Sequence, residues 1–159
     1  MNALNPDDWP SLAALPRDTF TSPSALVGVP YVRGGVTPAQ GFDCFTLVSY
    51  VRWHWFRRQT PVGQIPKRKL SPAAACALCM RRAFGREGDP VRSPWQKCEA
   101  REGCVVALGN SRLGRLHHCG VWFNGGVLHC LENVGVCWTP GERLGEVFKR
   151  VECYELCAD

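Results

Sequence analysis

The sequence predicts an α+β fold in which N-terminal helices pack on an antiparallel sheet. Two observations lead to this prediction. Helix caps and helical periodicity dominate the chain as far as residue 85, and short β-branched and aromatic segments separated by turn residues follow from residue 104. With 159 residues and 45% hydrophobic content, the chain is long enough for one domain with its own core. We expect an irregular arm over 1–21 and a domain over 22–159, with a Cys-rich insertion near 70–100.

Three helices are predicted from their caps. Ser22 followed by proline starts a short helix through residues 25–27, and the turn-rich segment 28–35 ends it. Asp43 caps a helix of about 14 residues, in which four apolar residues recur at helical spacing: Leu47, Val48, Val51 and Trp55. Ser71 and Pro72 repeat the cap signal before a third helix over 73–84, which Gly85 closes.

The second half predicts an antiparallel meander. The expected strands are CVVALG, HCGVWF, GVLHCL, VGVCW and VECYEL, all beginning at or after residue 104. If Asn124 and Gly125 form a two-residue hairpin turn, Phe123 pairs with Gly126. In that register Gly120 faces His129.

Composition and charge exclude several classes of protein. The net charge of +5 includes basic residues that bracket one connecting segment near 57–69, which we interpret as a solvated loop, so no nucleic-acid specificity is expected. No apolar run approaches about 18 residues, so no membrane span is predicted. The first 18 residues have no basic segment before an apolar one, so no secretory signal peptide is expected. Because thiols stay reduced in the cytosol, we interpret each of the ten cysteines as a buried thiol, a metal ligand or a nucleophile.

Cys44 is the candidate nucleophile. A thiol in the first turn of a capped helix faces N–H groups and a helix dipole that favour the thiolate and can hold an oxyanion. The same pattern also fits an ordinary buried cysteine. A nucleophilic thiol needs a base and a group that orients the base. The hairpin register makes His118 and His129 diagonal neighbours on one face, whereas His117 points to the opposite face.

Four motifs in order add a family resemblance. GVPYVRGG (28–35), GFDCFTL (41–47), HCGVW (118–122) and VLHC (127–130) resemble the motifs of the NlpC/P60 family of papain-like cysteine peptidases. The resemblance implies the papain-like NlpC/P60 fold, with Cys44 as nucleophile, His118 as base and His129 as the orienting third residue. It also implies that Tyr31 is the active-site tyrosine near the oxyanion. No cofactor is needed for catalysis in such a site.

The resemblance implies a peptidoglycan hydrolase that cleaves stem-peptide amide bonds, in many members between D-γ-glutamate and diaminopimelate. Phe45 stands where the family usually has serine, and an aromatic there resembles the tail-associated subgroup of phages and phage-like particles. This implies a tail-tip component that is assembled in the host cytoplasm with tail hub and tip proteins and acts in the host periplasm. Two alternatives stay open: a structural tail-hub subunit with little or no hydrolysis, and a cellular amidase or acyltransferase.

The insertion carries a second candidate site. Cys76 and Cys79 lie on one helical turn, and Cys98 and Cys104 follow, with Gly103-Cys104 replacing the family's Gly-Asp before the first strand. Such a set has the character of Zn²⁺ or iron–sulfur ligands, although the spacing fits no tight template. Buried thiols on a helix face, or a disulfide formed after delivery, are the alternatives. The cysteines of the later strands, Cys119, Cys130 and Cys137, are expected in the core.

Overall fold

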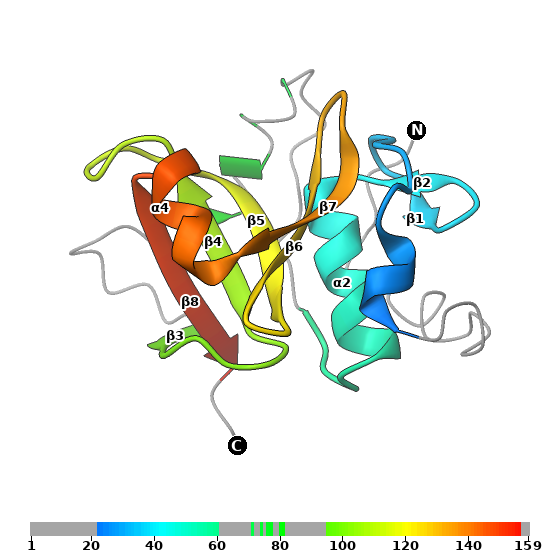
Figure 1. The fold of residues 1–159 in the computed structure, drawn as a ribbon, viewed down its shortest axis with the longest axis horizontal. Coiled ribbons are helices and arrows are strands. Elements are labelled where there is room, and N and C mark those ends of the chain that lie inside the picture. The colour runs from blue at the N-terminus through cyan, green and yellow to red at the C-terminus, as the bar shows by residue number, and fades with distance from the viewer. Residues whose placement is uncertain are drawn as a thin grey trace.

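A six-stranded antiparallel sheet, with the helix α2 packed against one face, organises the computed structural model (Figure 1). The structure describes residues 22–60, 71, 74, 76–77, 80–81 and 95–156. The helices are η3 (Pro23–Leu26), α2 (Cys44–His54), η4 (Gly141–Arg143) and α4 (Leu144–Val147). The strands are β1 (Val36–Thr37), β2 (Gly41–Phe42), β3 (Trp95–Cys98), β4 (Val105–Gly109), β5 (Leu116–Phe123), β6 (Gly126–Leu131), β7 (Gly135–Pro140) and β8 (Arg150–Leu156).

The strand order is β3-β8-β4-β5-β6-β7, and neighbouring strands are antiparallel. The predicted meander is confirmed from β4 to β7. It is wrong for β8, which crosses to the other edge of β4 and also pairs with β3. Strand β3 is not predicted by the sequence because it has no alternating pattern: Gln96 and Lys97 are both exposed on an edge.

The β5–β6 hairpin has the predicted register. Phe123 pairs with Gly126 and Gly120 with His129. Asn124 and Gly125 have φ of 51° and 76°, the left-handed pair that a type I′ turn requires and that favours Asn-Gly. The local turn chemistry therefore sets which side chains of β6 stand beside those of β5.

Helix α2 begins where the cap predicts. The Asp43 carboxylate accepts hydrogen bonds from the N–H groups of Phe45 and Thr46, and the Thr46 hydroxyl accepts from the Asp43 N–H, which completes a capping box. The helix ends at His54 and is thus shorter than predicted. Trp55, predicted as a helical residue, forms the C-cap instead and is 42% exposed.

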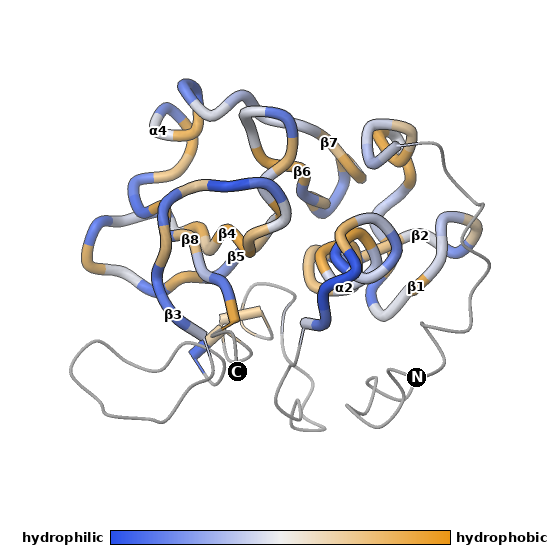
Figure 2. Tube along the Cα trace, turned by 90° about the horizontal axis from the view of Figure 1, so that it is seen from below, coloured by the Kyte–Doolittle hydropathy of each residue, from blue (hydrophilic) through white to orange (hydrophobic). Residues whose placement is uncertain are grey.

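The apolar side of α2 covers the sheet, as Figure 2 shows in its orange side turned toward β5. Leu47, Val48 and Val51 are buried as predicted. Because successive strand residues point to opposite faces, Val105 and Ala107 lie on the helix side with Val48, whereas Val106 lies on the far side with Phe148.

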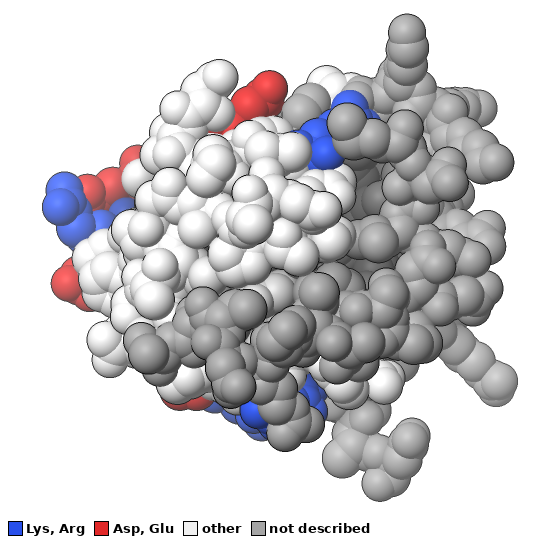
Figure 3. Space-filling model, turned by 90° about the vertical axis from the view of Figure 1, so that its right-hand side faces the viewer, with Lys and Arg blue, Asp and Glu red and all other residues white. Residues whose placement is uncertain are grey.

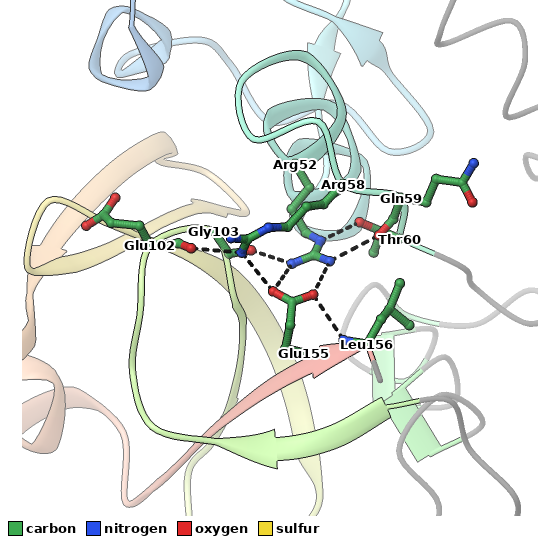
Figure 4. A network of polar contacts seen from close by, with 8 residues as sticks. All are labelled: Arg52, Arg58, Gln59, Thr60, Glu102, Gly103, Glu155 and Leu156. Atoms are coloured by element: carbon green, nitrogen blue, oxygen red, sulfur yellow. Dashed lines mark hydrogen bonds and ion pairs between the residues drawn. The ribbon is translucent and has the colours of Figure 1, made fainter. Parts of the chain in front are cut away.

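A buried ion pair ties the end of α2 to β8 (Figure 4). Arg52 has no exposed surface, and its Nη2 lies 2.7 Å from Glu155 Oε1. Arg52 also donates to the Gly103 carbonyl and, at 2.8 Å, to the Thr60 hydroxyl. These bonds hold α2 in a fixed position on the sheet, and hence also the residue at its N-terminus.

The arm 1–21 and most of the insertion lie outside the described residues. Within the predicted third helix, residues 74, 76, 77, 80 and 81 are helical, and the Ala74 N–H donates to Ser71 Oγ at 3.2 Å as the predicted cap requires. In the described part of the chain, no helix combines the length and the apolar character needed to cross a membrane. Figure 3 shows one face on which the described charged residues, of both signs, lie at the margins of an uncharged surface.

Candidate active site

Cys44 is the first residue of α2, and the residues around it leave its own N–H available. The next three N–H groups are used by Asp43: those of Phe45 and Thr46 by its carboxylate and that of Leu47 by its carbonyl. Among the hydrogen bonds between described residues, the Cys44 N–H takes part in none. A developing negative charge beside the thiol would meet this N–H and the positive end of the helix dipole.

The two predicted histidines are bonded to each other. His118 Nε2 lies 2.8 Å from His129 Nδ1, and both rings are buried. The His118 ring also stacks on Phe148, with 5.8 Å between ring centroids and 18° between planes. The stacking and the bond fix the imidazole, and the bond occupies Nε2, so Nδ1 is the ring nitrogen left to act as a base.

A third group continues this chain of contacts. His129 Nε2 lies 2.8 Å from Thr139 Oγ1 on β7. Burial, and next the neighbouring His118, lower the pKa of His129 to about 3, so it is neutral over the physiological range. A neutral His129 that donates from Nε2 to Thr139 presents a lone pair on Nδ1 to His118. The pair can therefore accept a proton on His118 without charging His129.

The sulfur of Cys44 lies among two other thiols. Its Sγ is 3.5 Å from Cys76 Sγ, and the Sγ atoms of Cys44, Cys76 and Cys119 all lie within 4.8 Å of one another. Hydrogen bonding with Cys119 and Cys76, opposed by burial and helped by His118, holds the pKa of Cys44 well below its usual value. Hydrogen bonding with Cys44 and Cys76, and next burial, raise the pKa of Cys119.

The GVPYVRGG segment is attached to this site through the helix cap. Asp43 Oδ2 accepts a hydrogen bond from the Gly34 N–H at 2.9 Å, and Tyr31 forms a bridge with Phe42, two residues before Cys44. Burial, and next the negative charges of Asp43 and Cys44, raise the pKa of Tyr31. Its phenol is therefore a neutral O–H donor.

Position 120, two residues after His118, has no room for a side chain. A Cβ atom at Gly120 would lie 2.7 Å from the Leu128 carbonyl oxygen and 3.1 Å from His129 Cβ, in addition to a clash with Val127. A side chain there would push β6 away and with it His129.

His117 differs from its neighbour His118. It is half-buried, and its Nε2 has no hydrogen-bond partner among the described residues.

The predicted metal-ligand set is not brought together by the residues that the structure describes. Cys76 packs with Cys44 and Cys119 on the helix side of the sheet. Cys104 lies on the opposite face, where Cys98 packs against the same cluster, because strand residues alternate between faces. Cys79 lies outside the described residues. The sequence separations alone could not reveal which face each strand cysteine occupies.

Two contacts of the site are not predicted by the sequence patterns. Thr139 is the diagonal neighbour of His129, since His129 pairs with Cys137 two residues before it. The predicted register of the β5–β6 hairpin, continued through the turn between β6 and β7, would have placed Thr139 beside His129. Cys119 is expected in the core, and it is buried there, but its Sγ also lies within 4.8 Å of Cys44 Sγ.

Comparisons with known proteins agree with this architecture. No family model matches the chain. A segment of 25 residues is 68% identical to a gamma-DL-glutamyl hydrolase of Bacillus subtilis (strain 168); it makes up 16% of this chain and 6% of that protein.

Two solved structures are similar over nearly the whole chain. One is a protein from Staphylococcus aureus subsp. aureus Mu50 described as similar to a lipoprotein of the NLP/P60 family, with a TM-score of 0.50 and 14% identity; the match covers 99% of this chain and 44% of that one. The other is the NlpC/p60 domain of the peptidoglycan hydrolase SagA, with a TM-score of 0.45, 15% identity and coverage of 94% and 98%. The staphylococcal match shows that the chain has the NlpC/P60 fold, an α+β fold of the papain-like type.

Proposed function

We propose that the protein is a cysteine peptidase that hydrolyses amide bonds in the stem peptides of peptidoglycan. The observation that carries this proposal is the bonded series His118–His129–Thr139, together with Cys44 at a helix N-terminus, where His118 helps to lower the pKa of the thiol. It combines a candidate nucleophile whose pKa is lowered, a histidine able to act as base and a neutral group that orients this base.

The chemistry follows from these positions. The Cys44 thiolate attacks the amide carbonyl carbon, and the carbonyl π electrons move to the oxygen, where the Cys44 N–H and the Tyr31 hydroxyl can donate to it. The C–N bond then breaks as the protonated His118 gives its proton to the leaving amine. Water attacks the resulting thioester while His118 takes its proton, which releases the acid and restores the thiolate.

The substrate class is proposed from the fold and from the relatives. The Bacillus subtilis protein is named a gamma-DL-glutamyl hydrolase, and one structural neighbour is a peptidoglycan hydrolase. We propose the bond between D-γ-glutamate and diaminopimelate as the first candidate. A γ-glutamyl amide carries its α-carboxylate carbon four bonds from the reacting carbonyl carbon, so the site must hold an anionic group near the reacting carbonyl.

Digestion of purified sacculi, with mass spectrometry of the released fragments, tests the proposal directly. The parent should release fragments that end in γ-D-glutamate. Cys44→Ala and His118→Ala should each abolish release, because nucleophile and base act as a unit. His117→Ala is the matched control, since it removes the adjacent imidazole and should retain most activity. Equal digestion by Cys44→Ala and the parent would remove Cys44 as the nucleophile.

We propose further that the protein acts at the tip of a phage or phage-like tail, assembled in the host cytoplasm with hub and tip proteins and delivered to the periplasm. The support is Phe45 in the position where the resemblance places an aromatic in the tail-associated subgroup. Proteomic analysis of purified particles, with immunogold labelling of the tail, tests this location. A protein found in the cell fraction and absent from particles would favour the cellular amidase alternative.

A further inference from the structure

We propose that Cys44, Cys76 and Cys119 form a binding site for a thiophilic metal ion such as Zn²⁺, and that the bound ion blocks the nucleophile. The catalytic scheme requires only one of these thiols. Cys119 and Cys76 come from strand β5 and from the insertion, and the fold places both sulfurs beside Cys44.

The spacing of the sulfurs fits one metal ion. The three Sγ atoms lie within 4.8 Å of one another, and the pair Cys44–Cys76 is 3.5 Å apart. Thiolates that bind Zn²⁺ at about 2.3 Å in tetrahedral geometry have their sulfurs about 3.8 Å apart. Small movements of side chains are therefore enough to place all three at bonding distance, with the fourth position left for water.

The surroundings select a soft ion. All three cysteines are buried, and the residues packed around them are mostly apolar, including Val48 and Trp95. A fourth sulfur, Sδ of Met80, lies 3.6 Å from Cys76 Sγ. Ca²⁺ and Mg²⁺ prefer oxygen ligands, whereas Zn²⁺ and Cu⁺ prefer thiolates, so the set of donors discriminates between the two classes.

The position of the three thiols in the fold favours binding of one ion. The ion would join three separate elements: the start of α2, the helical segment at residue 76 and strand β5. Its binding should therefore stabilise the attachment of the insertion to the domain.

The functional consequence rests on the proposed peptidase activity. A metal-bound Cys44 sulfur donates charge to the ion and is a much weaker nucleophile toward a carbonyl carbon than the free thiolate. The site would keep the peptidase inactive wherever free Zn²⁺ exceeds its dissociation constant, and loss of the ion would activate it. The protons released by the three thiols on binding go to solvent.

The test uses the full chain, purified and reduced under argon, with Zn²⁺ as the probe. Stoichiometry is read by native mass spectrometry, and affinity is read by competition with a chromophoric chelator. We expect one Zn²⁺ per chain and no competition by Ca²⁺. Cys119→Ser and Cys76→Ser should each weaken Zn²⁺ binding by more than about 100-fold, since even changes in the groups that support metal ligands cost about 10- to 100-fold.

The matched control is Cys130→Ser. Cys130 is as buried as Cys119, and its S–H donates to the Phe42 carbonyl, a bond that serine can keep. It should bind Zn²⁺ like the parent. The proposal is overturned if Cys119→Ser binds Zn²⁺ as tightly as the parent. It is also overturned if Cys98→Ser, and not Cys119→Ser, lowers the Zn²⁺ affinity. A reduced protein that takes up no Zn²⁺ overturns it too.

The inhibition is measured within each protein as the ratio of sacculus digestion with and without Zn²⁺. The parent should lose activity in Zn²⁺ and regain it with a chelator, whereas Cys119→Ser should need a far higher Zn²⁺ concentration for the same loss. If the metal-free parent digests no sacculi, the proposed function fails, while the stoichiometry and affinity still decide whether the thiol site exists.

Discussion

Replacing His129 with alanine tests how the site orients its base. The side chain contributes one acceptor to His118, at 2.8 Å between Nδ1 and Nε2, in a buried position. During the reaction this hydrogen bond goes to an imidazolium, and a hydrogen bond to a charged group contributes about 1.5–3 kcal/mol. At about 1.4 kcal/mol for each factor of ten, the loss of kcat/KM should be about 10- to 150-fold.

The expected loss is smaller than that for His118→Ala, because the nucleophile and base stay in place. His129→Gln should retain part of the activity, since its amide oxygen can accept from His118. Thr139→Val should lose only a few-fold, because it removes the partner of His129 and leaves His129 itself in position. We therefore predict that the loss of kcat/KM is largest for His129→Ala, smaller for His129→Gln and smallest for Thr139→Val.

Steady-state hydrolysis of a synthetic γ-D-glutamyl stem peptide gives these values. A purely structural role for His129 would lower the melting temperature and the amount of folded enzyme in the alanine and glutamine variants alike. An orienting role should lower kcat/KM for the folded enzyme and be recovered in part by glutamine. If His129→Ala is as active as the parent, or loses activity only as its melting temperature falls, the assignment is refuted.

The other predictions concern the backbone, stability and pH. Gly120→Ala should abolish activity in sacculus digestion and lower the melting temperature, because its methyl group meets β6; full activity would contradict the packing. Glu155→Gln should destabilise the fold by about 3 kcal/mol, since it leaves Arg52 buried without its anion, whereas the control Glu152→Gln, whose cationic partners are more exposed, should change little in urea unfolding. Burial raises the pKa of Glu155, but the hydrogen bonds and charge of Arg52, with smaller effects from its other neighbours, outweigh burial and lower it. The stability that Glu155 contributes is therefore present above its unfolded-state pKa and is lost as pH falls through its folded-state pKa. The glutamine variant should lose this acid dependence of stability. Iodoacetamide should modify Cys44 at pH values below the ordinary thiol range, and a rate that rises only near the usual cysteine pKa would contradict the stabilised thiolate.

Local chemistry in the sequence determined the framework of the site. Asp43 caps the helix that begins with Cys44, and Asn124-Gly125 sets the hairpin that pairs Gly120 with His129. Both effects act between residues close in the chain, through hydrogen bonds and φ preferences that hold in almost any surroundings. The pairing of the two histidines therefore follows from the amino-acid sequence by itself.

Only the tertiary structure decided what surrounds that framework. The path of β8 back to β4, and the face of the sheet on which each cysteine lies, depend on contacts between distant segments. Cys76 and Cys104 resemble one ligand set in the sequence, yet the sheet separates them, and Cys76 lies beside the nucleophile instead. Spacing along a chain specifies neighbours on one helix or one hairpin, whereas the packing of helices and strands against each other specifies everything else about the site.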